Sequence, residues 1–121
     1  MGFEKFTRPT LVGGLRYSNV ALTTSTGATM DDFDPTLINT TKNSAFFYLP
    51  VIRGEGHVKE VFWNFNDTGS FDIRANTTGT TFNGTTGNVL RVATSGIGGL
   101  TLIARSTSQW LAGGSAVTTV G

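Results

Sequence analysis

The sequence predicts an all-β protein, a sandwich or a barrel, and three observations support this class. Thr, Gly, Ser and Asn make up 53 of the 121 residues; Thr favours strands, while Gly, Ser and Asn favour turns. Typical helix formers are scarce, with only three Lys, three Glu and eight Ala. From Asp31 onward, short apolar runs alternate with turn residues at the spacing of an all-β domain.

Residues 1–16 are predicted to form an extended N-terminal arm, and residues 17–121 a single β-domain. Apolar residues in the arm are irregularly spaced and are interrupted by Pro9 and Gly13, so they follow neither a helical nor a strand period. A frayed terminus is the alternative. An arm lying on a neighbouring chain explains better why two phenylalanines occur so near the terminus. We expect the contacts of this basic arm to come from Phe3, Lys5, Phe6, Arg8, Leu11 and Arg16.

Seven or eight strands are predicted in the domain, separated by turns. The run 45–52 is apolar at nearly every position, which predicts burial on both faces. Pro50 places this strand at an edge or a bulge, because proline cannot donate to the sheet. A connection is predicted over 96–99 and a turn over 106–108. The strands are expected over residues 17–22, 36–39, 45–52, 59–66, 70–76, 89–93, 100–105 and 109–112.

Two neighbouring strands show their faces clearly. Val61, Trp63 and Phe65 alternate with mostly polar residues, and Phe71 and Ile73 do the same in the next strand. Asp67-Thr68-Gly69 between them is typical of a tight turn, so a hairpin is expected here. Further along, Phe82 is expected to be a buried plug, followed by a tight turn at Asn83-Gly84.

The composition excludes most chemistries of catalysis. No cysteine is present, which removes thiolate nucleophiles and thiolate metal sites. His57 is the only histidine and follows a turn, so a solvated loop side chain is expected. Asp31, Asp32 and Asp34 are candidate calcium ligands by residue type, but their spacing does not match an EF-hand loop and favours a turn. No catalytic residue, cofactor or metal site is expected.

The sequence also argues against several partners. A net charge of +1 and the absence of a basic stripe disfavour nucleic acid. No apolar run is long enough for a membrane-spanning helix, and no secretory signal is recognised. Trp63 and Trp110 are both expected in the core, so neither is expected to be an exposed sugar-binding ring. No pair of carboxylates stands out for glycoside hydrolysis.

Residues 59–112 resemble a segment found in small structural proteins of tailed-bacteriophage virions, which include head-decoration (cement) proteins and the tips of tail fibres. The resemblance rests on three features. The first is a Trp/Phe-rich strand followed by a short strand, and the second is a Thr/Gly-rich segment around one phenylalanine. The third is an apolar strand connected by a Ser/Thr turn to a strand that contains a tryptophan. These segments are residues 61–64 and 71–73, residues 79–84, and residues 100–111. The resemblance implies a jelly-roll-like antiparallel β-sandwich that is commonly a homotrimer, is made in the host cytoplasm and is mounted on the virion.

The expected function is therefore structural and non-catalytic. The protein is expected to decorate the outer surface of a capsid and to cement it by bridging neighbouring major capsid subunits. The alternative is a tail or vertex appendage, such as a receptor-binding tip that recognises a host glycan. A third hypothesis is a small sugar-active enzyme, which requires a cleft with two carboxylates that face each other.

Overall fold

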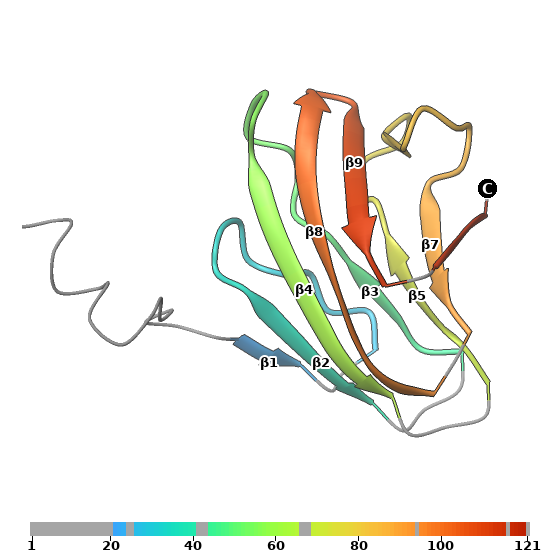
Figure 1. Ribbon diagram of the computed structural model, residues 1–121. Coiled ribbons are helices and arrows are strands. Elements are labelled where there is room, and N and C mark those ends of the chain that lie inside the picture. Colours follow the sequence, from blue (N-terminus) through green and yellow to red (C-terminus); the bar gives the residue numbers. More distant parts are fainter. Residues whose placement is uncertain are drawn as a thin grey trace, which may run out of the picture.

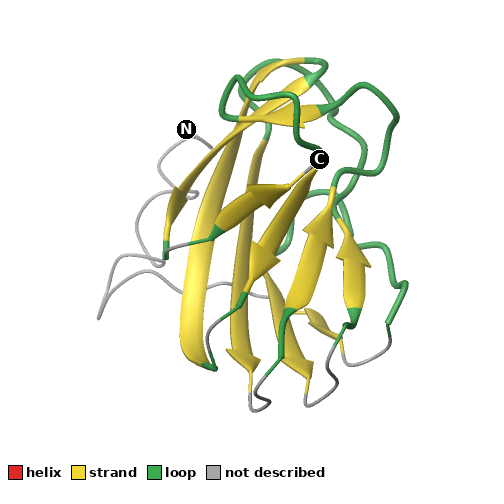
Figure 2. Cartoon of the chain, turned by 90° about the vertical axis from the view of Figure 1, so that its right-hand side faces the viewer, coloured by secondary structure: helices red, strands yellow, loops and turns green. Residues whose placement is uncertain are grey.

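Two β-sheets stack face to face in the computed structural model (Figure 1). It describes residues 21–23, 26–40, 44–65, 69–93, 95–115 and 117–120. This part of the chain contains strands and loops but no helix (Figure 2). The predicted all-β sandwich is thereby confirmed.

The larger sheet has six strands in the order β1-β2-β4-β8-β9-β6, and the smaller has four in the order β10-β7-β5-β3. The larger sheet contains β1 (Ala21–Thr23), β2 (Thr36–Thr40), β4 (Val58–Phe65), β8 (Gly96–Ser106), β9 (Gln109–Gly114) and β6 (Thr81–Phe82). The smaller contains β3 (Phe46–Tyr48), β5 (Phe71–Arg74), β7 (Val89–Val92) and β10 (Thr118–Val120). The described residues thus form ten strands against the seven or eight expected, and the very short β6 and β10 are among those not foreseen.

Both sheets are mixed, which corrects the expectation of an antiparallel sandwich. The pairs β1–β2, β2–β4, β3–β5 and β6–β9 are parallel, and the others are antiparallel. The cause is the path of the chain, which runs from β2 to β3 in the other sheet and then back to β4. Because the chain reverses twice, β4 runs in the same direction as β2 and pairs with it in parallel.

The predicted hairpin between the Trp63 and Phe71 strands is wrong for the same reason. β4 belongs to the six-stranded sheet and β5 to the four-stranded sheet, so the chain crosses the sandwich between them. The predicted faces are nevertheless correct, since Trp63 and Phe71 meet edge-to-face across the core with ring centroids 5.9 Å apart. Asp67 and Thr68 of the expected turn lie outside the described residues.

Two further boundaries differ from the expected ones. The run 45–52 forms a strand only over β3, and Val51 is 44% exposed, so burial on both faces is not observed. β3 does lie at the edge of its sheet, as Pro50 predicted. Residues 96–99 are the first residues of β8 rather than a connection. The first strand begins at Ala21, and residues 1–20 lie outside the described part of the chain.

An aromatic cluster occupies the centre of the core. Phe71 makes edge-to-face contacts with Phe47, Trp63 and Phe65 at centroid distances of 6.0, 5.9 and 5.2 Å. All four side chains are buried, and they come from both sheets. Edge-to-face pairs of this kind add to the free energy of apolar burial, so the cluster holds the two sheets together.

The predicted plug and turn at Phe82 are confirmed. Phe82 is fully buried, and Asn83 and Gly84 both have positive φ angles, 52° and 76°. The Thr85 N–H donates to the Phe82 carbonyl over 3.0 Å and closes the turn. Two successive positive φ angles are typical of a type I′ turn, for which Asn-Gly is the preferred pair.

Candidate partner-binding surface

The six arm residues expected to contact a partner lie outside the described residues. Phe3, Lys5, Phe6, Arg8, Leu11 and Arg16 all precede residue 21. The described chain begins at β1, which is an edge strand of the six-stranded sheet. The six residues therefore precede this edge strand in the sequence.

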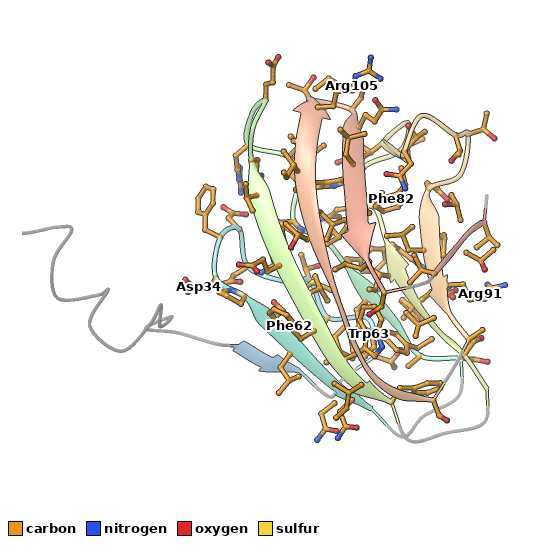
Figure 3. The ribbon with its side chains drawn as sticks, in the orientation of Figure 1. Asp34, Phe62, Trp63, Phe82, Arg91 and Arg105 are labelled. Atoms are coloured by element: carbon orange, nitrogen blue, oxygen red, sulfur yellow. The ribbon has the colours of Figure 1, made fainter. Side chains whose placement is uncertain are left out.

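The six-stranded sheet exposes apolar side chains on the face that points away from the core. Phe62 and Trp63, labelled in Figure 3, are neighbours in β4, yet Trp63 is buried whereas Phe62 is 39% exposed. Strand alternation places every second residue of β4 on this outer face, together with the residues that pair with them in the neighbouring strands. We call the following set the apolar outer face: Leu37, Val58, Phe62, Ile97, Ile103 and Leu111.

Three of these side chains form a row across three strands. Val58 of β4 pairs with Ile103 of β8, and Ile103 pairs with Leu111 of β9. Their exposed fractions are 45%, 45% and 43%. Directly opposed side chains on one face of a sheet contact each other, so the row is a continuous apolar strip. A contiguous strip of this kind often marks a surface that binds a partner.

Polar residues separate this strip from Phe62. Glu60 and Thr101 pair across β4 and β8 between the two apolar parts. At the end of the sheet, Arg105 (Figure 3) donates to the side chain of Gln109 over 3.1 Å. Mixed apolar and polar character is usual for an interface between proteins that also exist separately.

The sequence showed one sign of this face. Phe62 stands among Glu60, Asn64 and Asn66, in the polar phase of an alternating strand. Val58, Ile103 and Leu111 gave no comparable signal. They form a strip only because β4, β8 and β9 are neighbours, and the sequence pattern does not predict which strands pair.

Two aspartates of the 31–34 loop pair with basic side chains. Asp32 makes two hydrogen bonds with Arg53, at 2.9 and 3.3 Å. Asp31 forms an ion pair with Lys59 at 2.9 Å, and the Lys59 ammonium also donates to the Asp34 carbonyl. Within the described residues, no group of three potential ligands could hold a metal ion.

Lys59 is an unusual feature because its side chain is fully buried. It lies on the core face of β4, two residues before Val61, where an apolar residue is normally found. Burial of an ammonium group is costly unless the charge is paired and hydrogen-bonded. Asp31 and the Asp34 carbonyl meet this requirement, so Lys59 ties the loop to the end of the sandwich.

Asp31→Ala is expected to lower the free energy of unfolding by about 2 kcal/mol, because it leaves the buried Lys59 ammonium without its counter-charge. This figure is below the usual cost of breaking a buried pair, since the Asp31 side chain is 46% exposed. Lys59→Met is expected to cost only about 1 kcal/mol, because an apolar chain of similar length fills the site. Urea denaturation of both variants measures these costs.

The double variant Asp31→Ala/Lys59→Met provides the control. Once the buried charge is gone, the loss of Asp31 is expected to add little, so the double variant should be about as stable as Lys59→Met alone. Additive losses would contradict the pairing described above.

His57 is buried and not solvated, which corrects the expectation from the sequence. Its side chain is 7% exposed and packs against the ring of Trp110, with centroids 5.2 Å apart. The Ala104 N–H donates to the His57 carbonyl over 2.8 Å, so the pairing with β8 extends one residue before β4. His57 therefore points toward the core, as Lys59 and Val61 do. The sequence did not indicate this, because His57 directly follows a glycine-rich turn.

Asp72 stands between Phe71 and Ile73, where strand alternation predicts a solvent-facing side chain, but it is mostly buried. It is 9% exposed and makes two hydrogen bonds with Arg91, at 2.9 and 3.2 Å, and an ion pair with Arg74 at 3.6 Å. The hydrogen bond and the charge of Asp72 raise the pKa of Arg91 above its ordinary value. The Arg74 guanidinium in turn lies 4.1 Å from the centroid of the Phe46 ring. This network binds side chains of the four-stranded sheet to one another.

A hollow of about 210 Å³ lies at the end of the sandwich beside Trp63. Its lining contains no ionisable side chain, so it offers no acid or base for catalysis. It is lined by Trp63, Val92, Ser95, Gly96, Ile97, Gly98 and Ser115. In the described part of the chain, no helix is long and apolar enough to cross a membrane.

Comparison with known proteins gives no further assignment. No protein-family model matches the chain, and no curated protein matches it. The class that the fold defines is an all-β sandwich in two mixed sheets, and its most distinctive surface feature is the apolar outer face.

Proposed function

We propose that this chain is a structural, non-catalytic component of a virion, which decorates the outer surface of a capsid and bridges neighbouring major capsid subunits. The observation that carries the proposal is the apolar outer face of the six-stranded sheet. The sequence resemblance to head-decoration proteins supplies the class of partner. In this proposal the sandwich is jelly-roll-like, and three copies assemble on the capsid as a homotrimer.

The pairing of three described carboxylates supports a non-catalytic role. The carboxylates of Asp31, Asp32 and Asp72 are each engaged with a basic side chain. Glycoside hydrolysis needs two carboxylates that face each other across a substrate. These three are instead held in ion pairs that stabilise the domain.

Two contact regions suit attachment to a lattice of repeated subunits. The apolar outer face contacts one capsid subunit, and the arm, which joins the same sheet through β1, contacts the next. An extended segment of 16 residues can span roughly 50 Å, which is enough to reach a neighbouring subunit. Joining two weak contacts in one chain raises the overall affinity well above that of either contact alone.

Ile103→Asp is expected to reduce the occupancy of purified capsids at least tenfold, because it places a charge in the middle of the apolar strip. Val51→Asp is the matched control, since Val51 is exposed to the same extent, 44% against 45%, but lies outside the strands. Deletion of residues 1–16 is expected to cause a comparable loss. Quantitative electrophoresis of sedimented particles measures the occupancy of each variant.

Two results would contradict the proposal. One is occupancy that is unchanged by both Ile103→Asp and the arm deletion. The other is a copy number in the tens per virion, because decoration requires hundreds of copies. A low copy number would favour the alternative, a tail or vertex appendage.

A further inference from the structure

We infer that a surface hollow beside the 31–34 loop binds one ring of a neutral saccharide. This inference is independent of the proposed function, since the hollow shares no residue with the apolar outer face. Its volume is about 270 Å³. This is slightly below the volume of about 300–1,000 Å³ that is usual for ligand pockets, so the hollow suits a small ligand such as one monosaccharide ring. The hollow is lined by Phe33, Arg53, Gly54, Glu55, Gly56 and His57.

An exposed aromatic ring forms one wall of the hollow. Phe33 follows the loop aspartates and precedes Asp34, which is labelled in Figure 3. At 65% exposure, Phe33 is the most exposed aromatic side chain in the described part of the chain. The face of an aromatic ring carries partial negative charge, which attracts the polarised C–H groups on the apolar face of a pyranose.

The Phe33 ring is supported from behind. It packs against His57 with centroids 4.8 Å apart, and His57 packs in turn against the buried Trp110. Both nitrogens of His57 are engaged: Nδ1 accepts from the Arg53 N–H over 3.0 Å, and Nε2 lies 2.5 Å from the Asp32 carbonyl oxygen. Nε2 therefore carries the proton and donates. His57 is therefore a rigid support for the Phe33 ring, and a ring that is supported before binding loses less conformational entropy when a ligand binds.

Polar groups suited to hydroxyls lie on the Phe33 side of the domain. Arg53 is held by Asp32 through two hydrogen bonds, and their side chains remain 56% and 35% exposed. The guanidinium has further N–H donors, and the carboxylate has further lone pairs. The pair thus offers both donors and acceptors to a ligand that carries several hydroxyls.

The charge of the hollow favours a neutral ligand. The charges of Arg53 and Asp32 cancel, and the exposed Glu55 adds one negative charge. An anion such as a phosphate or a carboxylate therefore meets no net positive charge here. A neutral sugar has hydroxyls for these groups and does not bring a like charge.

The remaining wall is backbone. Gly54 and Gly56 both have positive φ angles, 152° and 86°, and an added Cβ at either position meets no atom within 4 Å. The loop conformation thus requires glycine at both positions, and the space above them stays open. A sugar ring can approach the backbone here, which side chains would prevent.

The test is a titration of the ¹⁵N-labelled protein with D-glucose, D-galactose, D-mannose, L-rhamnose, L-fucose and N-acetyl-D-glucosamine, followed by amide chemical shifts. At least one of these sugars is expected to cause saturable shifts that are confined to residues 32–34 and 53–57. Phe33→Ala is expected to weaken that binding at least tenfold. Phe62→Ala is the matched control, because Phe62 is an exposed phenylalanine on a different face, and it should leave the binding unchanged.

Several outcomes would overturn the inference. These are the absence of saturable shifts with all six sugars, shifts located elsewhere, or equal effects of the two phenylalanine variants. Binding of acetate or phosphate to the hollow in place of a sugar would also overturn it. Thermal denaturation of Phe33→Ala, which is expected to leave the midpoint nearly unchanged, ensures that loss of binding is not loss of fold. Capsid occupancy does not enter this test, so its result is separate from that of the proposed function.

Discussion

Replacing Phe71 with Ala is expected to lower the free energy of unfolding by about 4 kcal/mol, the largest effect of any single substitution considered for this protein. Phe71 is fully buried and contacts Phe47, Trp63 and Phe65. Its removal leaves a cavity at the point where the two sheets meet, and three edge-to-face ring pairs are lost with it. Urea denaturation followed by tryptophan fluorescence measures the change, because Trp63 borders the site.

Two further variants separate the cavity from the loss of aromatic contacts. Phe71→Leu keeps most of the volume and is expected to cost about 1.5 kcal/mol. Phe62→Ala removes the same side chain from an exposed position and is expected to cost less than about 1 kcal/mol. If Phe71→Ala costs no more than Phe62→Ala, the aromatic cluster does not hold the sheets together.

The faces of the strands could be predicted from the sequence, but their partners could not. Alternation identified Val61, Trp63 and Phe65 as a buried set and Phe71 and Ile73 as another, and all five are buried. Alternation reports on which side of a strand the core lies. It contains no information about which sheet a strand joins, so it does not distinguish the crossing from β4 to β5 from a hairpin.

The burial of polar residues in the core-facing phase could not be predicted from the sequence either. His57 and Lys59 continue the alternation of Val61 toward the N-terminus, yet a histidine or lysine is normally read as exposed. Each is buried because a loop distant in sequence supplies its partners: Asp32 for His57, and Asp31 with Asp34 for Lys59. Such pairing across about 25 residues leaves no trace in local composition.

The candidate surfaces also differ in whether they can be predicted from local sequence or depend on the tertiary fold. The arm remains a prediction from composition, because its residues precede the described part of the chain. The apolar outer face depends on the alignment of three strands, and the hollow at Phe33 depends on the contact of two loops. Neither could be derived from residue spacing, because each is created by the tertiary fold.

Gly98→Ala is expected to lower the free energy of unfolding by about 3 kcal/mol, the second largest effect. Gly98 pairs with Trp63 across β8 and β4, and a Cβ at Gly98 would lie 2.6 Å from three atoms of the indole ring. Trp63 is 3% exposed and contacts Phe71, so a displacement of its ring, even toward the neighbouring hollow, changes its packing in the aromatic cluster. The glycines at 96–99, which resembled a connection in the sequence, are therefore strand residues, and Gly98 leaves room for this ring.

Two glycines of the same sheet provide graded controls for this prediction, again by urea denaturation. A Cβ at Gly99 would lie 2.6 Å from the ring of Phe62, but that side chain is 39% exposed and can shift toward solvent, so Gly99→Ala is expected to cost about 1 kcal/mol. A Cβ at Gly113 meets nothing within 4 Å, and Gly113→Ala is expected to change stability by less than about 0.5 kcal/mol or to increase it slightly, because alanine restricts the unfolded chain. Equal losses at Gly98, Gly99 and Gly113 would mean that backbone conformation, and not the space beneath Trp63, accounts for glycine in β8.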